Sequence, residues 1–206
     1  MRQNPRIAAL KGWMQEKHLE EKLIKQYAKQ YKKNKPYQHI LIKDFLVEKQ
    51  ITFLKNALEK QEFEEKNNED SHYYQTKELA KSTSFVFGSF HTLLSSSYFL
   101  KWLQEITEVP KFKTYVDLHG LKLEKGSFLN QQHDMHRDRK IAYIISLSSA
   151  TKKEGGMFEL VYGKKKSYPL VKNTLLIFPV SRQNIYAVKE LKSKKDCFLL
   201  AGWFHG

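Results

Sequence analysis

The pattern of apolar residues changes near residue 111, and this change constrains the fold more than any other feature of the chain. Before it, apolar side chains recur at helical spacing; after it, short β-type runs alternate with polar or glycine-bearing turns. Eight runs follow one another: FKTYVDLHG, LKLEKG, KIAYIISL, GGMFELVYG, KSYPLV, NTLLIFPV, NIYAVKEL and CFLLAGWFHG. This order predicts an α+β fold in which an antiparallel sandwich or barrel carries helices on one sheet.

The helical half contains four predicted elements. A basic amphipathic helix is expected over residues 13–33, followed by a short strand over 39–42. A helix is expected over 48–60, and a further helix begins with Ser97 as its cap. The polar segment 64–71 is predicted to be a loop.

Two features bear on where the protein works. The uncharged segment Ser82–Leu100 is rich in serine, so we expect buried or loop structure there and no membrane span anywhere in the chain. The only cysteine, Cys197, cannot form an internal disulfide, which favours a reducing compartment. We therefore expect a cytoplasmic protein.

The chain is strongly basic, with 36 Lys and Arg against 22 Asp and Glu and a formal net charge of +14. This charge predicts an acidic partner such as RNA or a ribosome, reached through a basic helical arm at residues 1–35. Two alternatives remain open: the arm docks on the main domain, residues 36–206, through its apolar stripe, or the lysines only keep the surface solvated.

Several motifs in the second half appear in an order that resembles a known family. KGSFLNQQHDMHRDRKIAYIISLS, EGGMFELVYG, NTLLIFPVS, YAV and AGWFHG follow one another. They resemble the Fe(II)/2-oxoglutarate dioxygenases of the prolyl 4-hydroxylase type. Earlier segments, PYQHILIKDFL, YYQTKEL and LLSSSYFLKWLQEIT, resemble the N-terminal catalytic domain of ribosomal-protein prolyl hydroxylases. The resemblance covers residues 36–206 and implies a double-stranded β-helix core, jelly-roll or cupin-like, with the N-terminal helices packed on one sheet.

The resemblance also implies an iron triad, formed by a His-x-Asp pair and a more distal histidine. Aligning Gly126 and the basic pair 139–140 with the family pattern requires no gap. It places Gln132 where the first histidine is expected and Asp134 where the aspartate is expected. Only the carboxylate of this pair is kept.

The remaining positions differ from the pattern in the same way. Tyr186 falls where the distal histidine is expected, Cys197 where an arginine would pair with 2-oxoglutarate, and Ser146 where a tyrosine would contact it. These replacements predict a degenerate site, with no confident catalytic residue, no metal and no cofactor. The protein would then be a binding or scaffolding module for a protein or peptide partner.

An alternative keeps the enzyme active with an unusual set of metal ligands. A shifted register would recruit His133, Asp134 and His136. The protein would then use Fe(II) and 2-oxoglutarate to hydroxylate a prolyl or other side chain of a protein. A third hypothesis is a basic protein that associates with ribosomes or RNA.

Overall fold

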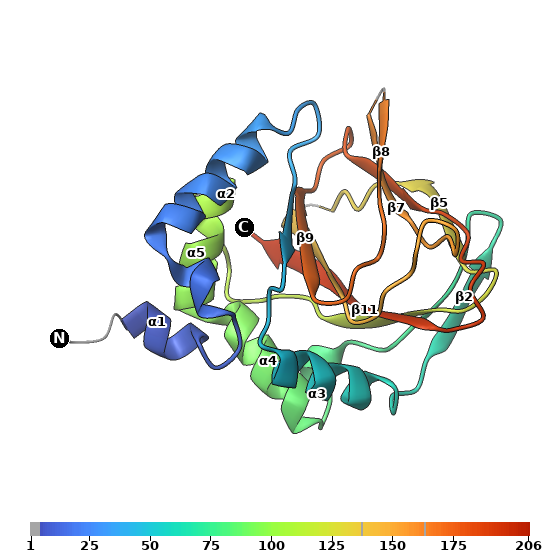
Figure 1. Cartoon of the computed structure of the whole chain (residues 1–206), viewed down its shortest axis with the longest axis horizontal. Helices are drawn as coiled ribbons and strands as arrows, with labels where there is room; N and C mark the ends of the chain where they lie inside the picture. The colour runs from blue at the N-terminus through green and yellow to red at the C-terminus, as the bar shows by residue number, and fades with distance from the viewer. Residues whose placement is uncertain (1–4, 137, 163) are drawn as a thin grey trace.

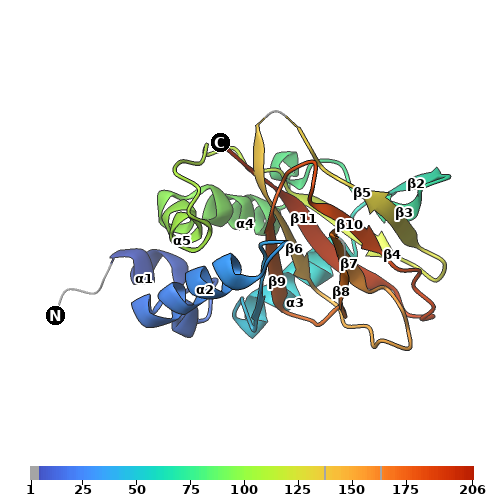
Figure 2. The same ribbon diagram turned by 90° about the horizontal axis from the view of Figure 1, so that it is seen from above.

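The structure, a computed structural model, describes residues 5–136, 138–162 and 164–206. Its helices lie together on one side of the strands (Figures 1 and 2). They are α1 (Pro5–Leu10), the 3-10 turn η1 (Glu16–Leu19), α2 (Glu21–Lys33), α3 (Glu48–Leu58), the 3-10 turn η2 (Leu79–Lys81), α4 (Phe85–Ser95) and α5 (Ser97–Thr107).

Three expectations for this half are corrected. The helix expected over 13–33 is divided into η1 and α2. Part of the segment 82–100 forms α4, a regular helix with buried Phe87, Phe90 and Leu94. The cap of α5 is Ser96 rather than Ser97, because the Ser96 hydroxyl accepts a hydrogen bond from the Phe99 amide at 3.2 Å.

The strands form one antiparallel, strongly curled sheet, as the sequence predicts (Figure 1). Its order is β1-β9-β6-β11-β4-β3-β5-β10-β7-β8, and β2 pairs with β3 at the side of this path. The strands are β1 (Ile40–Lys43), β2 (Glu64–Asn68), β3 (Ser71–Gln75), β4 (His119–Leu123), β5 (Phe128–Gln132), β6 (Arg139–Ser146), β7 (Phe158–Tyr162), β8 (Lys164–Tyr168), β9 (Thr174–Pro179), β10 (Ile185–Val188) and β11 (Cys197–His205).

Three strands, β2, β3 and β5, lie where none was expected. The segment 64–71, predicted to be a loop, forms β2 and the start of β3, which pair as a hairpin from Glu64–Gln75 to Asn68–Ser71. The strand β5 occupies Phe128–Gln132, upstream of the run that was expected to begin at Lys140. The strands β3 and β5 contribute side chains to the cavity inside the curled sheet, where the candidate site lies.

Alternation along the central strands separates two apolar regions. On β6, Ile141, Tyr143 and Ile145 belong to the large core shared with the helices. Ala142 on the opposite face belongs to a second cluster, which contains Phe178 and other side chains inside the curled sheet. This is the period of two that a strand buried on both faces imposes.

The N-terminal arm lies against the rest of the molecule. Leu10, Met14 and Ile24 are buried in the same core as the helices α3 to α5. The indole nitrogen of Trp102 on α5 donates to the backbone carbonyl of His18 at 2.9 Å. The arm therefore docks through its apolar stripe. Across the described part of the chain, every helix is too short or too polar to cross a membrane.

Candidate functional site

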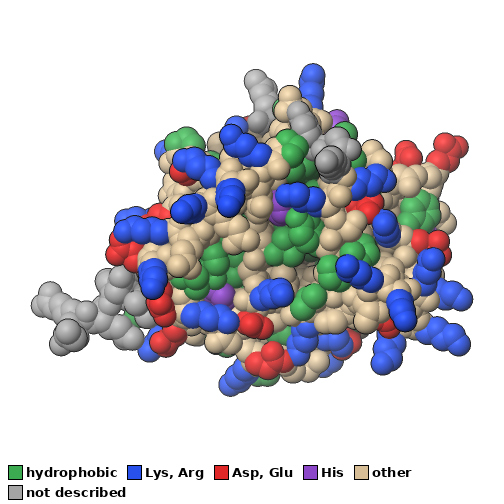
Figure 3. All heavy atoms as spheres, turned by 45° about the horizontal axis from the view of Figure 1, so that its top comes forward, with side chains coloured by type: hydrophobic (Ala, Val, Ile, Leu, Met, Phe, Trp, Pro, Cys, Tyr) green, Lys and Arg blue, Asp and Glu red, His purple; other side chains and the backbone are tan. Residues whose placement is uncertain are grey.

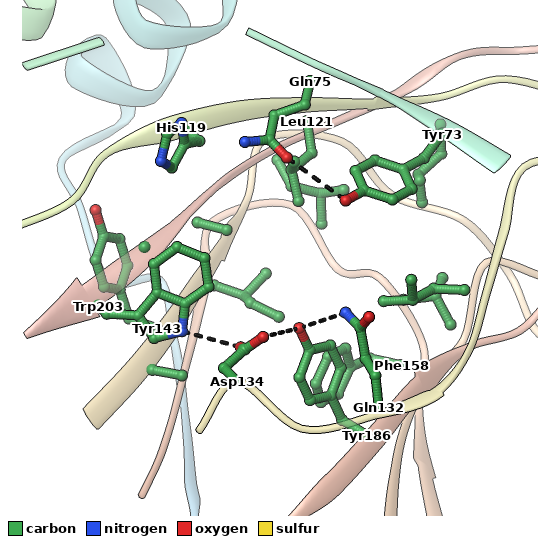
Figure 4. A pocket seen from close by; sticks show the side chains of 18 of the residues that line it. Tyr73, Gln75, His119, Leu121, Gln132, Asp134, Tyr143, Phe158, Tyr186 and Trp203 are labelled. Atoms are coloured by element: carbon green, nitrogen blue, oxygen red, sulfur yellow. Dashed lines mark hydrogen bonds between the residues drawn. The ribbon is translucent and has the colours of Figure 1, made fainter. Parts of the chain in front are cut away.

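A cavity of about 140 Å³ lies inside the curled sheet (Figure 4). Its lining residues come from strands at different places in the sheet, for example Tyr73 on β3, Phe158 on β7 and Trp203 on β11. Most of the lining is apolar or aromatic. The polar groups are few and gather mainly around Asp134, which follows β5.

The structure brings Gln132, Asp134 and Tyr186 together in this cavity. Gln132 and Tyr186 are directly paired across β5 and β10. The Gln132 side-chain amide donates to the Tyr186 hydroxyl at 2.9 Å, and this hydroxyl donates to Asp134 Oδ1 at 2.9 Å. The three positions that the sequence alignment selected thus form one hydrogen-bonded chain.

A fourth side chain completes this arrangement. Trp203 Nε1 donates to Asp134 Oδ2 at 2.9 Å, so both carboxylate oxygens accept a hydrogen bond from the protein. Figure 4 shows the Trp203 indole and the Tyr186 phenol pointing toward Asp134 from different strands. We call Gln132, Tyr186, Asp134 and Trp203 the polar chain.

Burial sets the protonation properties of the polar chain. Removal from water raises the pKa of Asp134, while the hydrogen bonds from Tyr186 and Trp203 oppose that shift by stabilising the ionised form. Burial also raises the pKa of Tyr186 well above its ordinary value, and the nearby Asp134 charge adds to this effect. Tyr186 is therefore a neutral phenol at physiological pH, which makes it a hydrogen-bond donor.

Ser146 and Cys197 lie away from the polar chain. Both are buried, on β6 and β11, and neither is among the described residues that line the cavity. Cys197 packs in a separate apolar cluster with Leu123, Leu170 and other side chains.

The thiol of Cys197 is expected to be inert in the folded protein. Burial raises its pKa to about 11, so only about one thiol in a thousand is ionised at pH 8, and the thiolate is the reactive form. We expect alkylation by iodoacetamide at pH 8 to be at least about a hundredfold slower in the native protein than in guanidinium chloride, where the thiol has its ordinary pKa. The chain has one cysteine, so mass spectrometry measures this directly. Similar native and unfolded rates would contradict the burial of this side chain.

The alternative ligands do not converge in the same way. The side chains of His133 and His136 are exposed, whereas Asp134 points into the cavity. The His133 Nδ1 atom accepts a hydrogen bond from the backbone amide of Met135 at 3.3 Å. Within the described ranges, no three His, Cys, Asp or Glu side chains are grouped so that they could hold a metal ion.

Sequence reasoning missed several polar residues of the cavity. Trp203 lies in the motif GWFHG, where a packing role was expected, and its hydrogen bond to Asp134 joins residues 69 positions apart. Alternation along β11 could have indicated it, because Leu199, Ala201 and Trp203 share one face and line the cavity. Gln75 and His119 also line it; His119 had no signal beyond its place on a β-type run, and Gln75 lies on β3, a strand that was not predicted.

A family model matches the second half of the strand-forming region, and solved structures share the fold. Residues 118–205 match the family model of the 2OG-Fe(II) oxygenase superfamily. The fold is the double-stranded β-helix of these oxygenases, as the sequence resemblance predicted. Comparison with the curated proteins finds no match.

Similar solved structures include prolyl hydroxylases and a further protein with 2-oxoglutarate bound. A prolyl-4-hydroxylase from Pseudomonas putida has a TM-score of 0.71 at 13% identity, over 87% of this chain and 98% of that chain. A prolyl hydroxylase from Trichoplax adhaerens, in complex with a peptide fragment of the hypoxia inducible factor oxygen degradation domain, has a TM-score of 0.71 at 13% identity, over 89% and 91%. HygX from Streptomyces hygroscopicus, with nickel and 2-oxoglutarate bound, has a TM-score of 0.64 at 12% identity, over 86% of each chain.

These comparisons correct the expectation about cofactors. The sequence predicted that the protein takes no cofactor, and that prediction is contradicted, because the matching superfamily is one of 2OG-Fe(II) oxygenases and HygX holds 2-oxoglutarate with a metal. Fe(II) and 2-oxoglutarate are therefore the groups that this family implies.

The residues present fit those groups poorly. In place of two imidazoles and a carboxylate, the cavity offers an amide, a neutral phenol and Asp134, whose two oxygens already accept hydrogen bonds. An amide and a neutral phenol are weaker ligands for iron than imidazole. No Lys or Arg is found among the described residues that line the cavity, so none of them could pair with the distal carboxylate of 2-oxoglutarate.

Proposed function

We propose that this protein is a prolyl-hydroxylase-like member of the 2OG-Fe(II) oxygenase fold whose catalytic centre is degenerate, and that it acts as a binding module. The observation that carries this proposal is the polar chain. Hydrogen bonds link Gln132, Tyr186, Asp134 and Trp203 where the family resemblance places an open iron site. A site of this kind retains a cavity of about 140 Å³ that can hold a ligand.

A protein or peptide segment is the partner class that we propose for this module. The Trichoplax prolyl hydroxylase, which has the same fold, was crystallised with a peptide fragment. The resemblance of the first half to ribosomal-protein hydroxylases makes a ribosomal protein one source of such a segment. Exposed lysines on α2 are consistent with RNA binding by residues 1–35, which stays a prediction. A cytoplasmic location also stays a prediction. Figure 3 shows Lys and Arg side chains spread over one face of the molecule rather than gathered in one patch.

Release of succinate tests the proposal. The protein and its Asp134→Ala variant are reconstituted anaerobically with Fe(II) and 2-oxoglutarate, and oxygen is then admitted. Asp134 is the only carboxylate of the polar chain, so an iron-dependent reaction would require it. We expect the two proteins to release equal, background amounts of succinate.

The opposite outcome identifies the alternative enzyme. If the unmodified protein releases at least about tenfold more succinate than the variant, the site is catalytic. The set His133, Asp134 and His136 would then be tested by replacing each histidine singly with Ala. The prolyl hydroxylase from Pseudomonas putida, which has the same fold, is a suitable positive control.

A further inference from the structure

The cavity carries one kind of charge. Asp134 is the only acidic side chain among its described lining residues, and neither Lys nor Arg is among them, in a chain with 36 such residues. Arg139 and His133 act on this partly buried carboxylate from outside the lining, and within the cavity its negative charge attracts positive charge and repels anions.

The geometry of Asp134 leaves room for a ligand. A carboxylate has about four positions that accept hydrogen bonds, and Tyr186 and Trp203 fill two of them. These two donors hold the carboxylate in one orientation. A ligand that donates to Asp134 would therefore meet a fixed acceptor and lose little of its binding energy to ordering the site.

The walls of the cavity suit an organic cation. The Tyr186 ring stacks on Phe158 with centroids 5.4 Å apart, and Phe178 lies against Tyr186 at 5.7 Å. Trp203 already accepts one cation: the Arg139 guanidinium carbon lies 3.5 Å from its ring centroid. Arg139 is outside the described cavity lining, although its charge acts on Asp134, and its contact with Trp203 shows that this indole binds a cation on its face.

The volume limits the size of the ligand. A cavity of about 140 Å³ is close to the engineered apolar cavities of ~150 Å³ that hold benzene, a molecule with about six non-hydrogen atoms. We propose that the cavity binds a compact alkylammonium group. The ammonium pairs with the Asp134 carboxylate, and the rings of Tyr186, Phe158 and Trp203 surround the alkyl part of the ligand. The proposal rests on the binding function proposed above. The group is either a free amine or the end of a lysine side chain.

A matched pair of ligands tests this assignment. Cyclopentylammonium and cyclopentanol have the same carbon ring and differ in charge. Each is titrated into the full-length protein, and binding is followed by the indole N–H signal of Trp203 in the NMR spectrum, assigned with Trp203→Phe. We expect the ammonium to bind at least about tenfold more tightly. A third titration with N-acetyl-lysine methylamide separates the two sources, because it binds only if the site accepts a side chain carried on a backbone.

Variants identify the carboxylate responsible. Asp134→Asn should remove the preference for the ammonium. Glu159→Gln is the control, because Glu159 is also buried on the same sheet and pairs with Lys189 at 3.0 Å, yet its side chain is not part of the described lining. It should leave the preference unchanged. Thermal unfolding of each variant verifies that it is folded.

The results separate this inference from the proposed function. Equal affinities for the two ligands, or a preference that survives in folded Asp134→Asn, overturns the cation assignment. If only cyclopentanol binds, the cation assignment is overturned, but the proposal that the protein is a binding module still stands. Release of succinate in the assay described above instead overturns the proposed function. A protein that binds none of the three compounds contradicts the cation assignment as well.

Discussion

The double substitution Gln132→His and Tyr186→His is expected to raise the affinity for Ni²⁺ at least about a hundredfold over the unmodified protein, or about 2.7 kcal/mol of binding free energy. The two residues are direct partners across β5 and β10, and the Tyr186 hydroxyl contacts Asp134. Two imidazoles at these positions would stand beside the Asp134 carboxylate. Two histidines and one carboxylate on one face are the ligand set of non-haem iron sites, and each ligand is stronger than the amide or phenol it replaces. Isothermal titration calorimetry measures the change.

A neighbouring residue supplies the control. Gln131 precedes Gln132 on β5 and its side chain is exposed, so in a strand it faces the opposite side. Gln131→His with Tyr186→His adds the same two histidines, but one of them points away from Asp134. We expect little gain from this variant. Equal gains for both variants would show that the metal is bound elsewhere, and no gain in a folded Gln132→His, Tyr186→His protein would contradict the assigned positions.

The fold could be predicted for those elements whose apolar periodicity is visible in the local sequence. Along β6 and β11, apolar residues on both faces mark strands buried between the helices and the interior of the sheet. The helices α3 and α5 each place apolar residues on one face, which the helical period shows directly. These elements follow from residues close together in the sequence.

The hairpin of β2 and β3 shows where such patterns fail. The sequence of β2, EEKNN, is almost wholly charged or amide and lies exposed at the edge of the sheet. Its pairing is determined by hydrogen bonds to β3 rather than by burial, and neither strand has a strong alternation of apolar residues. A strand without a buried face leaves no hydrophobic period in the sequence.

The candidate site could be predicted only in part, for the same reason. Its positions could be proposed because flanking motifs place Gln132 and Asp134 without a gap and also place Tyr186, although their roles stay a prediction. The partners of Asp134 could not be predicted, since Trp203 reaches it across 69 positions and only the folded sheet brings the two together. The same reasoning applies to the absence of Lys and Arg from the described lining, which no local motif encodes.

The largest expected loss of stability follows from the docking of the N-terminal arm. Trp102 on α5 is fully buried, packs against Phe99 with tilted rings whose centroids are 5.2 Å apart, and donates to the carbonyl of His18. We expect Trp102→Ala to lower the free energy of unfolding by about 3–5 kcal/mol, because it leaves a large cavity and an unsatisfied carbonyl between the arm and the helices. Urea unfolding followed by far-ultraviolet circular dichroism measures the loss without relying on tryptophan fluorescence.

A second residue on the same helix separates burial from helix propensity. Tyr98 lies on α5 with 40% of its surface exposed, so Tyr98→Ala removes an aromatic ring without opening a cavity. Its effect should stay within about 0.5 kcal/mol, as is usual for surface substitutions. Comparable losses in the two variants would mean that residues 1–35 do not pack on α5 in solution. A large loss in Trp102→Ala alone would show that the arm contributes to the stability of the whole domain, so that its lysines are displayed from a fixed surface.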